Sequence, residues 1–270
     1  MTGAPGGMFT AFGGALDALL VGTRNGGGNN ELHALKLADG TPLASYAPGS
    51  TPGPIGPING TPTIDYATRR VYFASLAAGG DTLFCLELNA SPVFTYRWSR
   101  NLGPISGSPV LRSGRVYVGT DAGVVYSLDA MSGGGDRTIA TADGPVKGFL
   151  FPDRRNDDLM FATDTKVWSV SDTAPAMTIN WTWTSAGLNP SVILYWPTTN
   201  LVYVGSRNGE LYELDFTSAT QVVPPTPKVQ VLGDGLGQVG APSLDIGVTP
   251  RLLVVGSEAG VVYGVEVPFP

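Results

Sequence analysis

Side chains that can act as a catalytic base, a nucleophile or a soft metal ligand are scarce in this sequence. Its 270 residues include one histidine, His33, and one cysteine, Cys85. A zinc site built from protein groups needs several histidine or cysteine ligands, so the composition argues against one. A single cysteine also excludes an intramolecular disulfide and leaves the redox compartment undecided.

The densest group of carboxylates lies in residues 153–158, which read Asp-Arg-Arg-Asn-Asp-Asp. Two arginines stand among the acids, and the spacing differs from the alternating acid and amide positions of a calcium loop. We therefore interpret the segment as a solvated turn whose charges pair with one another. No residue is predicted to bind a metal, to hold a cofactor or to catalyse a reaction.

Nucleic acid and phosphate ligands are also disfavoured. The 16 basic and 22 acidic residues give a net charge of −6, so a polyanion would be repelled. The glycine-rich stretches 26–28 and 133–135 do not lie between a strand and a helix, where a helix N-terminus could bind phosphate. No run of apolar residues is long enough to predict a membrane-spanning helix.

A short pattern that recurs six times explains where His33 and Cys85 lie. Its third position is a ring, and successive rings are 51, 42, 42, 44 and 51 residues apart. The rings are His33, Phe84, Tyr126, Trp168, Tyr212 and Tyr263. The next position holds Ala34, Cys85, Ser127, Ser169, Glu213 and Gly264, which are mostly small. We therefore expect His33 to pack as a flat ring between strands. Cys85 should be an ordinary strand residue without a basic neighbour to lower the pKa of its thiol.

Each copy of the pattern predicts one β-hairpin. The connections contain Asn, Asp and Gly, which tolerate the positive φ of tight turns, as in 120–123, 206–209 and 257–260. Another strand is expected before each hairpin, in segments such as 56–62 and 103–109, where glycine suits close approach of backbones. A fourth strand is expected in five copies, around residues 44–46, 94–98, 138–140, 180–183 and 229–232.

Four antiparallel strands repeated at intervals of roughly 40 to 50 residues are typical of β-propeller blades. The 37 glycines, the 22 prolines and the lack of helical periodicity predict an all-β chain. Residues 1–270 are predicted to form a single propeller domain of six four-stranded blades, the last incomplete or closed by the N-terminus. The units are approximately 8–48, 56–102, 103–143, 144–187, 188–235 and 236–270. Few residues follow the last strand, so we expect a module of a longer polypeptide.

The third unit carries the clearest family resemblance. Residues 103–110 read GPISGSPV, and residues 114–133 read GRVYVGTDAGVVYSLDAMSG. These segments resemble the quinoprotein-like β-propeller repeat, which is named after pyrroloquinoline quinone (PQQ) dehydrogenases and shared by many non-catalytic propellers. In the family, the Leu-Asp-Ala segment closes the third strand with a turn, which implies that Asp129 bonds its own backbone. The dehydrogenases use a vicinal cysteine pair, and smaller sugar-oxidising quinoproteins use a histidine base. This chain lacks the pair, and its histidine lies in the ring column.

Two pairs of aromatic residues on predicted outer strands are further candidates for recognition. Tyr96 and Trp98 are two residues apart, as are Trp181 and Trp183, so each pair is expected on one face of its strand. Such a pair can stack a sugar or anchor a protein partner. Packing against the neighbouring blade is the preferred interpretation.

Loops that a propeller places on one rim offer a better-reasoned binding surface. The longest are 23–30, 76–81 and the link 49–57, and loops on a rigid scaffold often carry function. Their candidate contact residues are Arg24, Asn25, Asn29, Asn30 and Asp81. Length-tolerant surface loops without a role fit the same sequence.

We therefore predict a non-enzymatic PQQ-like propeller that serves as a scaffold for a protein partner or a small polar ligand. The family resemblance implies an extracytoplasmic location, although residues 1–8 lack the features of a signal peptide. Two alternatives stay open: a quinoprotein-type or calcium-dependent enzyme that uses the central channel, and a sensor domain for a small ligand such as a sugar.

Overall fold

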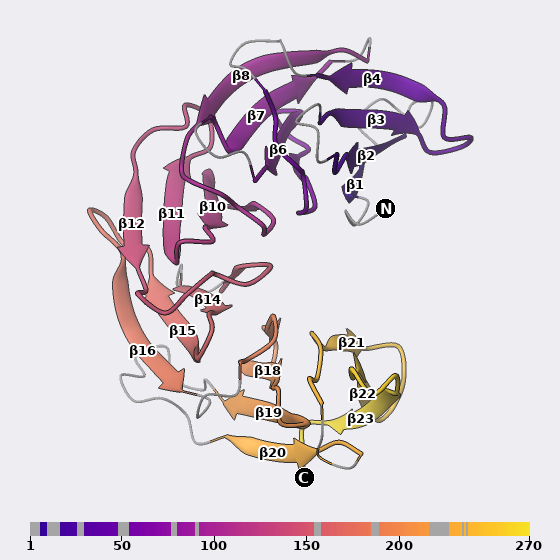
Figure 1. Cartoon of the computed structure of the whole chain (residues 1–270), viewed down its shortest axis with the longest axis vertical. Coiled ribbons are helices and arrows are strands. Elements are labelled where there is room, and N and C mark those ends of the chain that lie inside the picture. Colours follow the sequence, from indigo (N-terminus) through magenta and orange to yellow (C-terminus); the bar gives the residue numbers. More distant parts are fainter. Residues whose placement is uncertain are drawn as a thin grey trace. The chain divides into compact units, whose positions relative to one another are not determined.

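The computed structural model describes residues 6–9, 17–25, 30–47, 54–76, 80–89, 92–153, 158–184, 189–215, 227–233, 235 and 237–270. These residues form 23 strands, and none of them is helical. Strands that follow one another in the sequence pair antiparallel in six separate sheets, which we number in chain order (Figure 1). The all-β prediction is confirmed for this part of the chain.

The strands of sheets 1 to 3 lie in the first half of the sequence. Sheet 1 contains β1 (Gly6–Phe9), β2 (Ala18–Gly22), β3 (Leu32–Lys36) and β4 (Pro42–Tyr46). Sheet 2 contains β5 (Thr63–Asp65), β6 (Arg70–Ala74), β7 (Leu83–Leu88) and β8 (Phe94–Arg100). Sheet 3 contains β9 (Val110–Arg112), β10 (Arg115–Gly119), β11 (Val124–Asp129) and β12 (Arg137–Ala140).

The strands of sheets 4 to 6 follow in the same order. Sheet 4 contains β13 (Phe151–Pro152), β14 (Asp158–Ala162), β15 (Lys166–Ser171) and β16 (Thr178–Thr184). Sheet 5 contains β17 (Leu194–Trp196), β18 (Leu201–Gly205), β19 (Glu210–Asp215) and β20 (Lys228–Val231). Sheet 6 contains β21 (Ser243–Asp245), β22 (Arg251–Gly256) and β23 (Val262–Val267).

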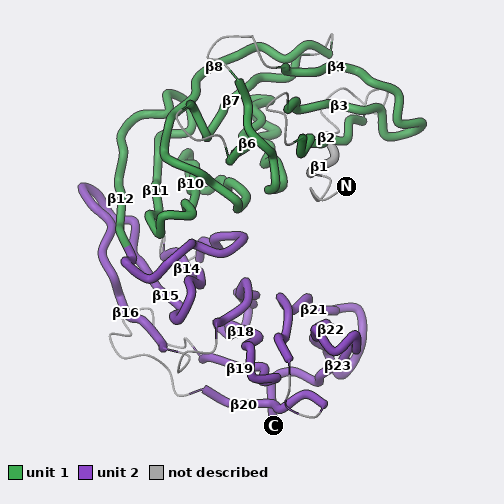
Figure 2. The backbone as a smooth tube through the Cα atoms, viewed as in Figure 1, with its two compact units in different colours: residues 1–140 green, residues 141–270 purple. Residues whose placement is uncertain are grey.

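The chain divides into two compact units (Figure 2). Unit 1 is residues 1–140 with sheets 1 to 3, and unit 2 is residues 141–270 with sheets 4 to 6. Each sheet falls within one of the six ranges expected from the repeats, except that β1 begins two residues before residue 8. Because β1 pairs with β2, this segment belongs to sheet 1. Sheet 6 has three strands among the described residues.

The six hairpins expected from the repeated pattern are present, and glycine closes several of their turns. In the turn between β10 and β11, the N–H of Thr120 donates to the C=O of Val124 at 2.9 Å, and Gly123 has a φ of 77°. The corresponding Gly209 and Gly260 have φ values of 77° and 79°. Glycine reaches this left-handed region without the steric cost of a Cβ, so the turn residues fix the hairpin register.

The first strands of sheets 2 and 3 begin later than the sequence predicted. The segments 56–62 and 103–109 are not strands, and β5 and β9 begin directly after them. Prolines in both segments lack the N–H that a strand ladder requires. The segments instead pack backbone against backbone, because a Cβ added at Gly60 would lie 2.7 Å from the carbonyl carbon of Gly107.

Within each unit, the sheets pack face to face. We call the face that meets the following sheet the forward face and the opposite face the rear face. In sheet 2 the forward face carries Tyr72, Cys85 and Trp98, and the rear face carries Phe73 and Phe84. Two apolar cores lie in unit 1, between sheets 1 and 2 and between sheets 2 and 3. Two more lie in unit 2, between sheets 4 and 5 and between sheets 5 and 6.

A β-bulge separates the members of one aromatic pair. In β7–β8, Cys85 lies opposite Trp98 and Leu86 lies opposite Tyr96, so Arg97 is an extra residue on β8. Trp98 therefore faces forward and is 8% exposed, whereas Tyr96 is on the rear face and 37% exposed. The prediction that these two rings share a face is wrong, because the bulge changes the alternation between them.

The second aromatic pair does share a face. Trp181 and Trp183 lie opposite Ser169 and Val167, on the forward face of sheet 4. Trp181 is buried in the core, and the ring of Trp183 is 4.9 Å from that of Tyr212 in sheet 5. The packing interpretation is confirmed for this pair.

The contact between the segments before β5 and β9 gives a first prediction. The substitution Gly60→Ala should lower the free energy of unfolding by about 2 kcal/mol or more, because its Cβ would push two backbones apart. The shift in the urea midpoint, followed by tryptophan fluorescence, measures this loss.

Gly134→Ala is the matched control in the same unit. Its Cβ would have its nearest neighbour, Ser132 Oγ, at an ordinary distance of 3.6 Å, so its effect should stay within about 1 kcal/mol. Equal midpoints for the two variants would show that the backbones at Gly60 are not in close contact.

Candidate functional site

His33 occupies the ring column but is only partly enclosed. Its side chain is 30% exposed, and Nε2 lies 3.5 Å from Oε2 of Glu31. The equivalent Phe84 in sheet 2 is fully buried and stacks on Phe73 with ring centroids 4.8 Å apart. The column thus holds a packed ring in sheet 2 and a partly exposed imidazole beside a carboxylate in sheet 1.

Cys85 is fully buried in the core between sheets 2 and 3. Burial raises the pKa of its thiol to about 12, and the nearby Arg70 guanidinium offsets only part of that effect. The prediction that Cys85 lacks a basic neighbour is therefore wrong, because strand pairing brings in a residue distant in sequence. The thiol is nevertheless protonated at neutral pH and is a weak nucleophile.

The acidic segment 153–158 is described only at its ends. Asp153 is 4% exposed, and its N–H donates to the C=O of Asp158 at 2.6 Å. Residues 154–157 lie outside the described residues, so the self-paired turn stays a prediction. No three histidine, cysteine or acidic side chains are grouped as potential metal ligands in the described part of the chain.

Three loop segments predicted to share a rim come together in unit 1. The N–H of Ile58, after the first link, donates to the C=O of Thr23 at 3.0 Å. The N–H of Leu76 donates to the C=O of Pro57 at 3.0 Å. The link between sheets 1 and 2 therefore joins the hairpin loops of both sheets.

The candidate contact residues on these loops have different environments. Arg24 and Asn25 are exposed, whereas Asn30 is fully buried. The Asn30 side chain donates to the C=O of Asn25 at 3.0 Å and to the C=O of Ile55 at 3.3 Å, so it supports the loop. Asp81 accepts a hydrogen bond from the hydroxyl of Ser99, and Asn29 lies outside the described residues.

The turn after β11 has the bonding that the family resemblance implies. Oδ1 of Asp129 accepts hydrogen bonds from the N–H groups of Met131 at 3.1 Å and Ser132 at 2.8 Å. Bonds from Ser132 hold the pKa of Asp129 below its ordinary value. Gly133 ends the turn with a φ of 70°, and a Cβ there would lie 2.7 Å from the Trp98 ring. The turn of sheet 3 is thus fitted against the forward face of sheet 2.

A polar row joins the segments that precede sheets 4, 5 and 6. The ammonium group of Lys147 donates to the side chain of Asn189 and, at 2.9 Å, to the C=O of Pro190. The Gln238 amide donates to the C=O of Asn189 at 3.3 Å. Burial lowers the pKa of Lys147, and the Asp164 carboxylate opposes this effect. These contacts fix the three segments to one another.

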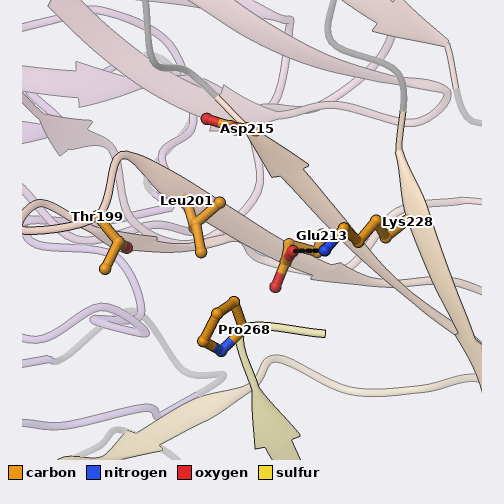
Figure 3. A pocket seen from close by; sticks show the side chains of 6 residues that line it. All are labelled: Thr199, Leu201, Glu213, Asp215, Lys228 and Pro268. Atoms are coloured by element: carbon orange, nitrogen blue, oxygen red, sulfur yellow. Dashed lines mark ion pairs between the residues drawn. The ribbon is translucent and has the colours of Figure 1, made fainter. Parts of the chain in front are cut away.

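A cavity of about 530 Å³ opens on the forward face of sheet 5 (Figure 3). We call it the sheet-5 pocket. It is lined by Thr199, Leu201, Glu213, Asp215, Lys228 and Pro268. Five of these residues come from sheet 5 and the turn before β18, and Pro268 follows the last strand of sheet 6. The pocket therefore lies where the end of one sheet meets the face of the preceding one.

Glu213 is the buried charge of the pocket, with 3% exposure. Its Oε2 accepts a hydrogen bond from the N–H of Phe269 at 2.7 Å, and its Oε1 lies 3.8 Å from Nζ of Lys228. Lys228 also donates to the C=O of Phe269 at 2.6 Å. Burial and the Glu213 charge raise the pKa of the neighbouring Tyr203 above its ordinary value. The ammonium and the amide stabilise the buried carboxylate and hold Phe269 on sheet 5.

In the sequence Glu213 belongs to the small-residue column, and that pattern predicts no role for it. Its counterparts Ala34, Cys85, Ser127 and Ser169 are all buried. A carboxylate at a position that is buried in four of the other five repeats needs a partner, and Lys228 lies directly opposite on β20. Glu213 is the one charged residue in this column of the sequence, and that difference could have identified it as a candidate.

No family model and no curated protein matches this chain. Its fold does match 1257 chains of solved structures. One is the crystal structure of the computationally designed Ika8 protein, with a TM-score of 0.66 and 11% sequence identity. The match covers 93% of this chain and 68% of the designed chain. At this identity the likeness shows a shared fold alone.

The raised pKa of Cys85 gives a second prediction. At pH 8 the native thiol should react with a chromogenic disulfide such as DTNB at least about 10³-fold more slowly than a free cysteine, because little of it is thiolate. Absorbance of the released thiolate measures the rate.

The same protein in denaturant is the control for this reaction. Unfolding should restore stoichiometric and rapid labelling, because both burial and the raised pKa are lost. A native rate within tenfold of the denatured rate would contradict the buried environment of Cys85.

Proposed function

We propose that the six sheets are blades of a β-propeller of the quinoprotein-like, PQQ-like repeat family. The proposal is supported by the six-fold sequence pattern, each copy of which folds as the hairpin of one antiparallel sheet. It is also supported by the forward-to-rear packing that recurs within each unit and by the turn at Asp129.

We propose that the chain is a non-enzymatic scaffold that binds a protein partner. The groups best equipped for chemistry serve packing or pairing, since Cys85 is buried with a raised pKa and His33 lies beside Glu31. The family resemblance supports an extracytoplasmic location. Among the described residues, no helix is long and apolar enough to span a membrane.

The forward face of sheet 6 is the observation that carries this proposal. Val262 on β23 is 71% exposed, and Val254 on β22 is 41% exposed. The positions equivalent to Val262 are Leu32, Leu83, Val125, Val167 and Leu211, all with 0% exposure. The positions equivalent to Val254 are Leu20, Tyr72, Tyr117, Met160 and Tyr203, none above 3%. Within each unit, this face is covered by the following sheet in sheets 1, 2, 4 and 5, whereas no described sheet of unit 2 covers it in sheet 6.

A protein surface is the partner that suits this face best. Gly256 and Gly264 are also exposed there, so the face is flat and apolar at its centre. Contiguous exposed apolar residues on a soluble domain mark contact sites. Among the described strands β23 pairs only with β22, which leaves an edge that another strand can extend.

A photo-crosslinking amino acid placed at position 262 gives the third prediction. In cells that make the protein, irradiation should yield one discrete adduct with a second protein, identified by mass spectrometry. A second substitution, Val254→Arg, should remove the adduct because it places a charge on the apolar face.

Position 93 is the control, because Val93 is 57% exposed but lies outside sheet 6. It should give no discrete adduct. Equal adducts from both positions, no adduct from position 262, or crosslinks only to residues of the same chain would each contradict the proposed protein-binding face.

The enzyme alternative is tested on the purified protein. A scaffold should carry neither stoichiometric calcium by elemental analysis nor quinone absorbance in the near-ultraviolet. A bound ion or quinone at one equivalent would favour the quinoprotein-type enzyme over the scaffold.

A further inference from the structure

The sheet-5 pocket lies at a position that tryptophan fills in two other sheets. The residue on the fourth strand opposite the small column is Trp98 in sheet 2 and Trp181 in sheet 4. In sheet 5 it is Lys228. Both tryptophans are buried, with 8% and 4% exposure, whereas the Lys228 side chain is 55% exposed.

Lys228 reproduces the hydrogen bond of the tryptophan but not its volume. Nε1 of Trp98 donates to the C=O of Ala130 at 3.1 Å, in the turn of the following sheet. Lys228 donates to the C=O of Phe269 at 2.6 Å, in the segment that follows β23. A lysine stem is narrower than an indole ring, so space remains beside it where sheet 2 is close-packed.

The charges around this space are unequal. Glu213 and Asp215 contribute two carboxylates, and Lys228 contributes one ammonium group. Glu213 is buried, where an electrostatic interaction is less screened than in water. The pocket thus has an excess negative charge, and the net charge of −6 attracts cations to the molecule as a whole.

The pocket also has apolar lining residues and is open to solvent. Leu201 and Pro268 supply carbon surface, and Asp215 and Lys228 are exposed to solvent (Figure 3). A volume of about 530 Å³ with apolar walls and a few polar groups fits a small organic molecule.

We propose that the sheet-5 pocket binds a small organic cation, an amine carried on an aromatic or aliphatic body. The cation pairs with Glu213, Asp215 adds to the negative charge of the pocket, and the body takes the space that an indole ring occupies in sheets 2 and 4, against Leu201 and Pro268. This site is independent of the protein-binding face proposed for sheet 6.

Calorimetric titration of the full chain with phenethylamine tests the proposal. Phenethylamine should bind at least about tenfold more tightly than the neutral 2-phenylethanol or the anionic phenylacetate, because one charge-assisted hydrogen bond to a buried carboxylate is sufficient for that difference. Equal binding of the three compounds would overturn the proposal.

Four variants assign the binding to the pocket. Glu213→Gln, which keeps an acceptor for the Phe269 N–H, should weaken phenethylamine binding about tenfold or more. Lys228→Trp should abolish it by filling the space. Lys228→Met should strengthen it several-fold, because the competing ammonium group is removed. The control Glu258→Gln, an exposed carboxylate in the turn after β22, should change nothing.

The direction in which each Lys228 variant changes the affinity for phenethylamine tests the proposal. Weaker amine binding in Lys228→Met than in the parent protein would overturn the proposal, as would full affinity in Lys228→Trp or Glu213→Gln. Thermal unfolding of each variant is measured alongside, so that a loss of binding counts only where the melting transition is retained.

Discussion

Face-to-face burial between consecutive sheets is the constraint on which the other features of each unit depend. In sheets 1, 2 and 4 the forward face closes on the next sheet with a small residue in the column, and in sheet 5 it does so with a charged residue that is paired. The positions equivalent to Val262 are therefore fully buried in sheets 1, 2, 4 and 5, whose following sheet lies in the same unit, and the small column holds Ala34, Cys85 and Ser127 in sheets 1 to 3. Burial of this apolar surface supplies the main driving force for association of the sheets. Glycine then permits the linking segments to touch, as at Gly60 and Gly107.

The burial of forward faces also explains the positions of the two candidate sites, which are the forward face of sheet 6 and the sheet-5 pocket. Within unit 2, no described sheet covers the forward face of sheet 6, so Val254 and Val262 are exposed there although their sequence is that of a core. The forward face of sheet 5 is covered by sheet 6, but a charged pair replaces the small residue and the tryptophan found at the same positions in sheets 2 and 4. Both sites differ from the equivalent positions of other sheets, and the repeats make that comparison possible.

Local features of this fold could be predicted from the sequence, and features set by contacts between strands could not. The hairpins and their glycines at 123, 209 and 260 depend on neighbouring residues alone, so the repeats located them correctly. The bulge at Arg97 has no local signature, and it changed the face of Tyr96. Burial of Asn30 and the approach of Arg70 to Cys85 depend on distant segments. Glu213 was visible in its column, but its partner Lys228 became recognisable only through the register of β19 and β20.

Stability alone does not account for the charged pair in sheet 5. A buried ion pair is costly to desolvate, and replacing one by packed apolar residues is often neutral or stabilising. Sheet 2 shows the apolar alternative, because Cys85 and Trp98 occupy the equivalent positions there and form a closed core. Glu213 and Lys228 hold Phe269 in place of such packing, yet a neutral acceptor and donor would form the same two hydrogen bonds. The charges instead give the wall of the sheet-5 pocket a preference for ligands of one charge. Such a preference matters for recognising a ligand and is not needed to join two sheets.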